Sequence, residues 1–161
     1  MQNKGNKAFI FGVATSGENF TDRQNETKRL LLNFQQGINT VLISLRRIGK
    51  TSLVRKVCEL AKSDDLKIVY LDIFSCRSDR EFYDAFATAV LRQTSSKLEE
   101  WVDNAKRFLS RITPKFSIGT DPMTDFSVSL ELNMKSEDVT DILQLPEKIA
   151  SDKGIKIVIC I

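Results

Sequence analysis

A glycine, a lysine and a threonine in succession give this chain its clearest chemistry. The stretch Ser44–Thr51 (SLRRIGKT) follows the phosphate-binding pattern G-x-x-x-x-G-K-[ST], with Ser44 in the place of the first glycine. Consecutive backbone N–H groups at the start of a helix form a concave site for multiply charged phosphates. We therefore predict that a nucleotide's phosphates are bound by seven consecutive residues: Arg46, Arg47, Ile48, Gly49, Lys50, Thr51 and Ser52.

Each residue type at the centre of this loop has a physical reason to be there. Gly49 lets the backbone approach phosphate oxygens because no side chain stands in the way. Lys50 can reach the β- and γ-phosphates as a mobile point charge, and the Thr51 hydroxyl can ligate the Mg²⁺ that bridges them. Arg46 and Arg47 can contact phosphate or a neighbouring subunit. ATP and Mg²⁺ are therefore the expected cofactors.

A phosphate loop needs a strand before it and a helix after it. Thr40–Leu45 (TVLISL) is a short β-branched apolar run, typical of a buried strand. Lys50–Ser63 repeats apolar residues at helical spacing. Ser44 is small, so it can replace the first glycine if that position does not need a positive φ.

The other elements follow from hydrophobic periodicity. The N-terminal part reads as an opening loop at 1–19 and a helix over Asp22–Phe34, capped by Thr21 or Asp22 and stopped by Gly37. After the phosphate-loop helix we expect a strand at Leu66–Phe74 and then helices at Asp79–Gln93 and Leu98–Leu109. A β-hairpin within Phe116–Leu132 follows. The chain then continues with a helical region from Glu137, which has Pro146 near its first turn and Gly154 past its end, and with a strand at Ile155–Ile161. This order predicts an α/β fold with a mostly parallel sheet and an inserted hairpin.

Composition limits the classes of protein that this chain can belong to. Its 161 residues suit one domain, and no apolar run is long enough for a membrane helix. We find no signal peptide and expect a cytoplasmic protein with reduced cysteines. The chain has no histidine and no CxxC pair, so the usual zinc sites and Ser-His or Cys-His triads are not expected. A net charge of +3 does not indicate a nucleic-acid partner.

Two motifs resemble the archaeal/bacterial ATPase domain family of AAA-type proteins, relatives of the signal-transduction ATPases. Arg46–Leu53 (RRIGKTSL) is similar to the family's R-R-x-G-K-T-S-L loop. Glu18–Arg23 (ENFTDR) is similar to its F-x-[GD]-R-E box, with Gln24 where the family usually has Glu. Weaker similarity lies at Tyr70–Ile73 and at Glu81-Phe82. The resemblance covers most of the chain and implies a P-loop NTPase three-layer sandwich.

The resemblance also implies roles for residues outside the loop. Phe20, Asp22 and Arg23 become candidates to lie near the adenine base. Ile157–Ile161 (IVICI) is similar to the apolar half of a Walker B strand, whose Asp-Glu pair is expected beyond Ile161. Residues 40–161 would then be an incomplete P-loop core. We expect this chain to bind ATP as part of a hydrolase without hydrolysing it alone.

Three alternatives remain open from the residues. Asp72 also ends an apolar run, Ile68–Asp72 (IVYLD), and could hold Mg²⁺ as in small P-loop kinases or GTPases, although no guanine-specific N-K-x-D motif occurs. The nucleotide site could be vestigial in a non-enzymatic interaction module. The hairpin, finally, could bind a protein partner or mediate self-association.

Overall fold

The computed structural model describes residues 23–109, 113–118, 126–131 and 136–161. Phe20 and Asp22, and with them part of the predicted adenine-side box, lie outside the described residues. The chain divides into two compact units, Met1–Ala61 and Lys62–Ile161. Each unit is described by itself.

The first unit is a pair of packed helices, α1 (Gln24–Gln36) and α2 (Lys50–Ala61). Both were predicted, and both turn an apolar stripe toward the other. Leu30 of α1 is buried with Leu53 and Val57 of α2, and Leu31 and Phe34 pack against this cluster. The phosphate-loop helix is therefore held by the helix that begins just after the predicted adenine-side box.

The two ends of α1 test the predicted helix stop at Gly37 and the predicted N-terminal cap. Gly37 stops the helix in the left-handed conformation, at φ 70°, and Ile38 N–H donates to the Asn33 carbonyl at 2.9 Å. The cap prediction was wrong. Arg23 holds the N-cap position with φ 70° and makes no side-chain cap, so α1 begins later than Thr21 or Asp22 would have set it.

The second unit contains the sheets. Its elements in chain order are β1 (Leu66–Tyr70), a 3₁₀ turn (Ile73–Ser75), α3 (Asp79–Thr94), α4 (Leu98–Phe108), β2 (Thr113–Ile118), β3 (Phe126–Glu131), α5 (Ser136–Leu143), α6 (Leu145–Lys153) and β4 (Lys156–Cys160). β1 and β4 pair in parallel, with Ile68 opposite Val158. β2 and β3 form the predicted antiparallel hairpin, with Phe116 opposite Val128.

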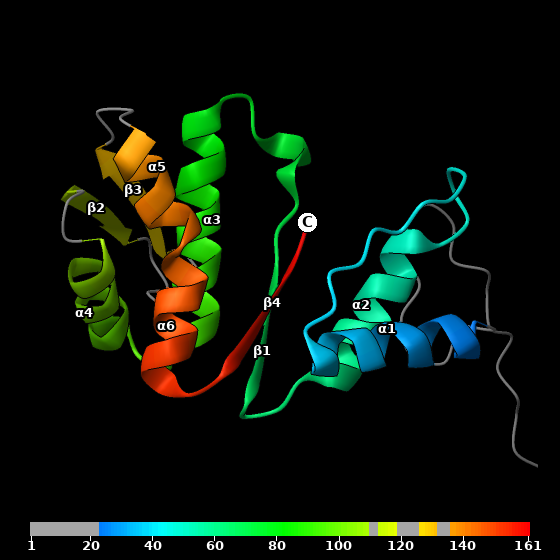
Figure 1. Cartoon of the computed structure of the whole chain (residues 1–161). Coiled ribbons are helices and arrows are strands. Elements are labelled where there is room, and N and C mark those ends of the chain that lie inside the picture. The colour runs from blue at the N-terminus through cyan, green and yellow to red at the C-terminus, as the bar shows by residue number, and fades with distance from the viewer. Residues whose placement is uncertain (1–22, 110–112, 119–125, 132–135) are drawn as a thin grey trace, which may run out of the picture. The chain divides into compact units, whose positions relative to one another are not determined.

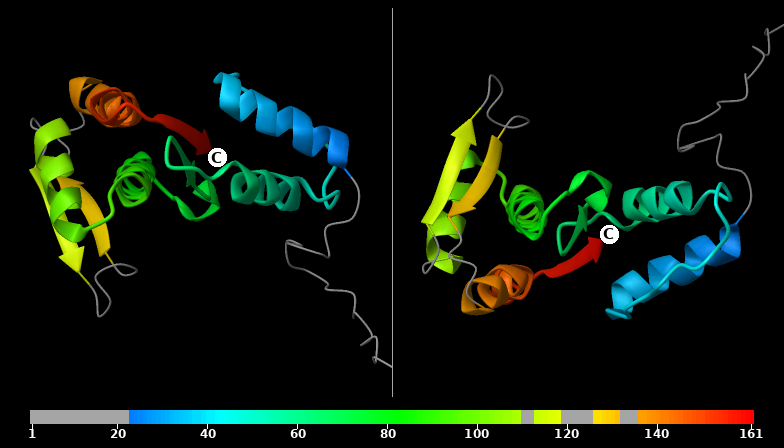
Figure 2. Two further views of the ribbon diagram at one scale, coloured as in Figure 1. Left: turned by 90° about the horizontal axis from the view of Figure 1, so that it is seen from below. Right: turned by 90° about the horizontal axis from the view of Figure 1, so that it is seen from above.

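Helices separate the two sheets of this unit. α3 and α6 lie against the β1·β4 pair, and the hairpin lies on the other side of α3 (Figures 1 and 2). The core between these layers consists of large apolar side chains that are almost fully buried: Val69, Leu71, Phe86, Val90, Leu91, Trp101, Leu109, Ile142, Leu145 and Ile149. An α/β architecture with a parallel strand pair is thus present.

Two predicted strands differ from the observed backbone. The first, Leu66–Phe74, ends as a strand at Tyr70, because Asp72 accepts a hydrogen bond from Phe74 N–H and begins the 3₁₀ turn. The second prediction, Thr40–Leu45, was wrong for the described structure. This segment forms no strand, because the first unit supplies no neighbouring strand in its described residues, and a β-ladder requires a partner.

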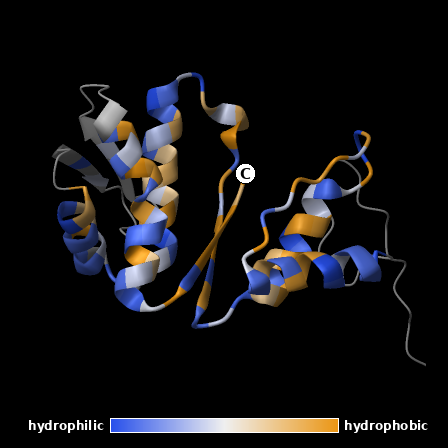
Figure 3. Cartoon of the chain, viewed as in Figure 1, coloured by the Kyte–Doolittle hydropathy of each residue, from blue (hydrophilic) through white to orange (hydrophobic). Residues whose placement is uncertain are grey.

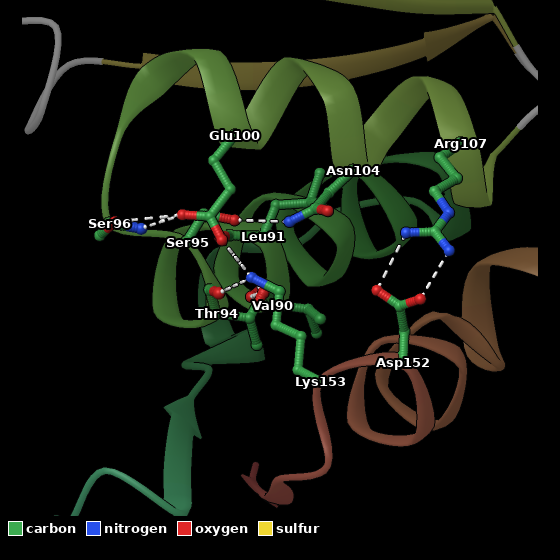
Figure 4. Close-up of polar contacts among 10 residues, drawn as sticks. All are labelled: Val90, Leu91, Thr94, Ser95, Ser96, Glu100, Asn104, Arg107, Asp152 and Lys153. Carbon is green, nitrogen blue, oxygen red and sulfur yellow. Dashed lines mark hydrogen bonds and ion pairs between the residues drawn. The ribbon is translucent and has the colours of Figure 1, made fainter.

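A polar cluster joins three helices at the end of the second unit opposite the β1 and β4 C-termini. The Lys153 ammonium of α6 donates to the Thr94 carbonyl at 2.6 Å and to the Glu100 carboxylate of α4 (Figure 4). The same carboxylate accepts from Ser96 N–H at 2.7 Å. Lys153 therefore satisfies a carbonyl at the end of α3 while it pairs with α4.

We expect this cluster to make the second unit less stable in acid. The Lys153 ammonium and the Ser96 N–H lower the pKa of Glu100, against the opposing effect of burial. A lowered pKa gives stability that is present above the unfolded value, about 4.3, and is lost as pH falls through the folded pKa. Because Glu100 is partly exposed, Glu100→Gln should cost only about 1 kcal/mol at neutral pH and less near pH 3, which is below the unfolded pKa.

Denaturant unfolding followed by the fluorescence of Trp101, the chain's single tryptophan, measures this difference because that side chain is buried in the same unit. An equal cost of Glu100→Gln at both pH values would contradict the assignment.

Candidate phosphate-binding site

The segment before the loop is held at its start by α1. Asn33 Nδ2 donates to Thr40 Oγ1 at 2.9 Å, and Thr40 Oγ1 donates to the Ile38 carbonyl at 3.2 Å. Sequence reasoning missed this contact, because residues 33 and 40 carry no pattern that links them. Figure 3 shows hydrophobic colouring along much of the stretch that leads into α2. Helix α1 thus sets where the approach to the loop begins.

The loop backbone has two left-handed residues just before the helix. Arg47 has φ 65° and Gly49 has φ 73°, while Ile48 between them is not left-handed. Alternation of left-handed and right-handed residues is found in anion-binding nests, in which successive N–H groups line a concave site. Ser44 is not left-handed, so its position does not require glycine. The departure from the pattern at Ser44 therefore costs no backbone strain.

Lys50 closes the loop from within. Its Nζ donates to the Ser44 carbonyl and to the Leu45 carbonyl, each at 3.0 Å. An ammonium has three N–H donors, so these bonds hold the head group in place and leave a third donor for an anion. The sequence spacing of Ser44 and Lys50 predicted a phosphate loop, but the contacts of Lys50 Nζ with the two carbonyls could be seen only in the structure.

The helix after the loop begins at the predicted residue. Leu53 N–H donates to the Gly49 carbonyl at 2.9 Å, so the first helical bond starts from the glycine itself. Ser52 and Leu53 are buried, at 6% and 2% exposed, and Leu53 packs with Leu30 and Val57. Thr51 is exposed. The first-turn N–H groups of α2 add their partial positive charge to that of Lys50.

The loop residues that precede Gly49 are open to solvent. Arg46 and Arg47 are exposed, and Ile48 is 44% exposed. The seven predicted phosphate-site residues, Arg46 to Ser52, lie on this loop and on the first turn of α2. Of the three adenine-side candidates, the structure describes only Arg23, which holds the cap position of α1.

Asp72 has a local structural role in the second unit. Its Oδ1 accepts the Phe74 N–H at 3.0 Å, which fixes the turn after β1. Phe74 itself is 96% exposed on that turn. The rival prediction that Asp72 ligates Mg²⁺ is not tested by this contact, since a carboxylate has further lone pairs. Within the described parts of the chain, no group of three or more Cys, Asp or Glu side chains is placed to hold a metal ion.

A shallow groove of about 540 Å³ lies in the second unit, among α4, the α5–α6 junction and α6. Its lining residues are Phe108, Gln144, Glu147, Lys148, Ser151 and Asp152. Two of them are already paired, because Asp152 forms a bidentate ion pair with Arg107 and Lys148 pairs with Asp141 at 2.7 Å. The groove contains none of the predicted site residues, so we assign no ligand to it.

No protein family, no curated protein and no solved structure matches this chain. The site therefore rests on its own geometry. No helix in the described ranges is long and apolar enough to cross a membrane.

Proposed function

We propose that this chain is the ATP-binding P-loop module of an AAA-type ATPase, built as a P-loop NTPase three-layer sandwich. The observation that carries the proposal is the Lys50 ammonium, held by the carbonyls of Ser44 and Leu45 beside a loop with left-handed Arg47 and Gly49. The parallel β1·β4 pair with its covering helices supports the fold part of the proposal.

In this proposal the loop residues contact different parts of Mg·ATP. The backbone N–H groups around Gly49 and the start of α2 donate to phosphate oxygens, and Lys50 gives its third donor and its charge to the β- and γ-phosphates. The Thr51 hydroxyl is the oxygen that the loop offers to the Mg²⁺ of Mg·ATP. Arg46 and Arg47 add positive charge at the rim, and Arg23 with Phe20 and Asp22 forms the adenine side.

The proposal assigns binding to this chain and leaves hydrolysis to the whole protein. Water activation in this class of enzyme needs an acid close to the γ-phosphate. By the resemblance, that acid pair would follow the strand that ends at Cys160. We therefore expect negligible turnover of Mg·ATP by residues 1–161 alone, in a coupled assay for ADP release. Robust turnover would show that the catalytic acid lies within residues 1–161, and Asp72 would be the first candidate.

A matched pair of glycine variants tests phosphate binding. Gly49 and Gly154 are both left-handed, at φ 73° and φ 64°, and an added Cβ meets no atom within 4 Å at either position. Alanine at either position should cost about 1 to 2 kcal/mol of backbone strain. In a calorimetric titration, Gly49→Ala should weaken Mg·ATP binding about tenfold, because a relaxed backbone turns its N–H groups away. Gly154→Ala should bind like the wild type.

Equal Mg·ATP affinities of the two glycine variants would contradict the proposal. The absence of a heat of Mg·ATP binding to the wild type would contradict it too. The second outcome would favour the alternative function, a non-enzymatic interaction module with a vestigial site. One observation supports that alternative. Val41, Ile43 and Leu45, on the approach to the loop, are 84%, 91% and 80% exposed, and exposed apolar side chains of this kind suit a protein partner or self-association.

A further inference from the structure

The two units carry opposite charge, which the whole-chain value of +3 conceals. The Met1–Ala61 unit has ten Lys and Arg against four Asp and Glu, a net charge of +6. The Lys62–Ile161 unit has fourteen against seventeen, a net charge of −3. No acid occurs between Glu26 and Glu59. The first unit therefore attracts polyanions more strongly than the composition of the chain suggests.

Part of this charge lies on the solvent face of α1, away from the phosphate loop in sequence. Lys28 and Arg29 are exposed there, at the centre of the helix. The other exposed residues of α1 are four amides, one acid and one leucine: Gln24, Asn25, Gln35, Gln36, Glu26 and Leu32. Lys, Arg, Asn and Gln are the side chains that most often contact phosphates and base edges of nucleic acids. α1 is about 20 Å long, and an α-helix fits the major groove of a duplex.

We propose that the solvent face of α1 binds double-stranded nucleic acid, chiefly through backbone phosphates at Lys28 and Arg29. A membrane surface fits this face less well, since the apolar stripe of α1 is already buried on α2 through Leu30, and Leu32 is the one large apolar side chain exposed on it. Single strands fit less well, because the exposed residues of α1 include no aromatic ring for base stacking.

Fluorescence anisotropy of a labelled DNA duplex of about 20 base pairs, titrated with the 1–161 chain without nucleotide at about 50 mM and about 200 mM salt, tests the proposal. The double variant Lys28→Gln with Arg29→Gln should weaken binding at least about tenfold at low salt and reduce the salt slope by about two. The control, Lys97→Gln with Lys106→Gln, removes the same charge from exposed positions of the second unit. It should bind within about twofold of the wild type.

Four outcomes would overturn the proposal. The first is no duplex binding by the wild type at low salt. The second is an equal loss in both double variants, which would show a net-charge effect only. The third is binding that Mg·ATP or Lys50→Ala abolishes while the α1 variant retains it, because the loop would then be holding the DNA phosphates. The fourth is binding by the wild type to phosphatidylserine vesicles but not to the duplex. The Mg·ATP titrations are independent of all four, so the phosphate loop and the α1 surface can fail separately.

Discussion

Replacing Lys50 by alanine should weaken Mg·ATP binding by at least about a hundredfold, close to 3 kcal/mol. The substitution removes a charge-assisted hydrogen bond to phosphate and also the two bonds that hold Ser44 and Leu45 in the loop, both 3.0 Å long. The Lys50 ammonium thus both binds the phosphates and holds the loop that forms the phosphate site. We therefore expect a larger loss than a surface cation beside a phosphate would give. Calorimetric titration with Mg·ATP measures it.

Lys56→Ala is the matched control, because Lys56 lies on the same helix and carries the same charge. Its affinity should stay within about threefold of the wild type, with only the long-range charge removed. Lys50→Arg keeps the charge, but the guanidinium fork does not reproduce the position of the ammonium, and we expect weak binding there too. Equal losses for Lys50→Ala and Lys56→Ala would show that the loop acts only through net charge.

Replacing Leu91 by alanine should destabilise the second unit by about 3 kcal/mol. Leu91 is fully buried in the core that includes Trp101 and Ile149, so truncation removes apolar contacts and leaves a cavity. The core lies between the β1·β4 pair and the hairpin, and neighbouring side chains can close only part of that space. Denaturant unfolding followed by Trp101 fluorescence reports the loss, because the indole is 4% exposed in the same core.

Leu143→Ala is the control for that measurement. Leu143 belongs to α5 of the same unit but is 47% exposed, so the same truncation should cost less than about 1 kcal/mol. If both variants lost the same free energy of unfolding, the cost would come from helix propensity or from the unfolded state, and the packing assigned to Leu91 would be wrong.

The helices of this protein could be predicted closely, because the signals that make them are local. Apolar spacing placed α3 at Asp79–Gln93, and the structure has Asp79–Thr94. Gly37 and Gly154 were expected to end helices, and both do so in the left-handed conformation. The turn-rich stretch between two alternating runs likewise predicted the β2–β3 hairpin. Each of these features depends on residues within one or two turns of one another.

Two strand predictions failed, one for lack of a partner strand and one because a local turn competes with the strand. The apolar run Thr40–Leu45 has the composition of a strand, but a strand exists only with a neighbour to bond to, and composition cannot provide one. Asp72 ends β1 early through a bond to its own turn, which competes locally with the continuation of the strand.

For the candidate site, the sequence by itself determined the residue types: a glycine, a lysine and a threonine at the spacing that suits phosphate, in front of an amphipathic helix. The tertiary structure alone decided how they act. It placed the left-handed turn at Arg47 and not at Ser44, and it set the Lys50 ammonium on two carbonyls. It also paired β1 with β4 and joined Lys153 to Glu100. Residue types and helical periods are properties of neighbouring residues, whereas the β1·β4 pairing and the Lys153–Glu100 contact depend on where distant backbone segments come together. The loop contacts of Lys50 span only five and six residues, and they depend on backbone angles that the residue types alone do not fix.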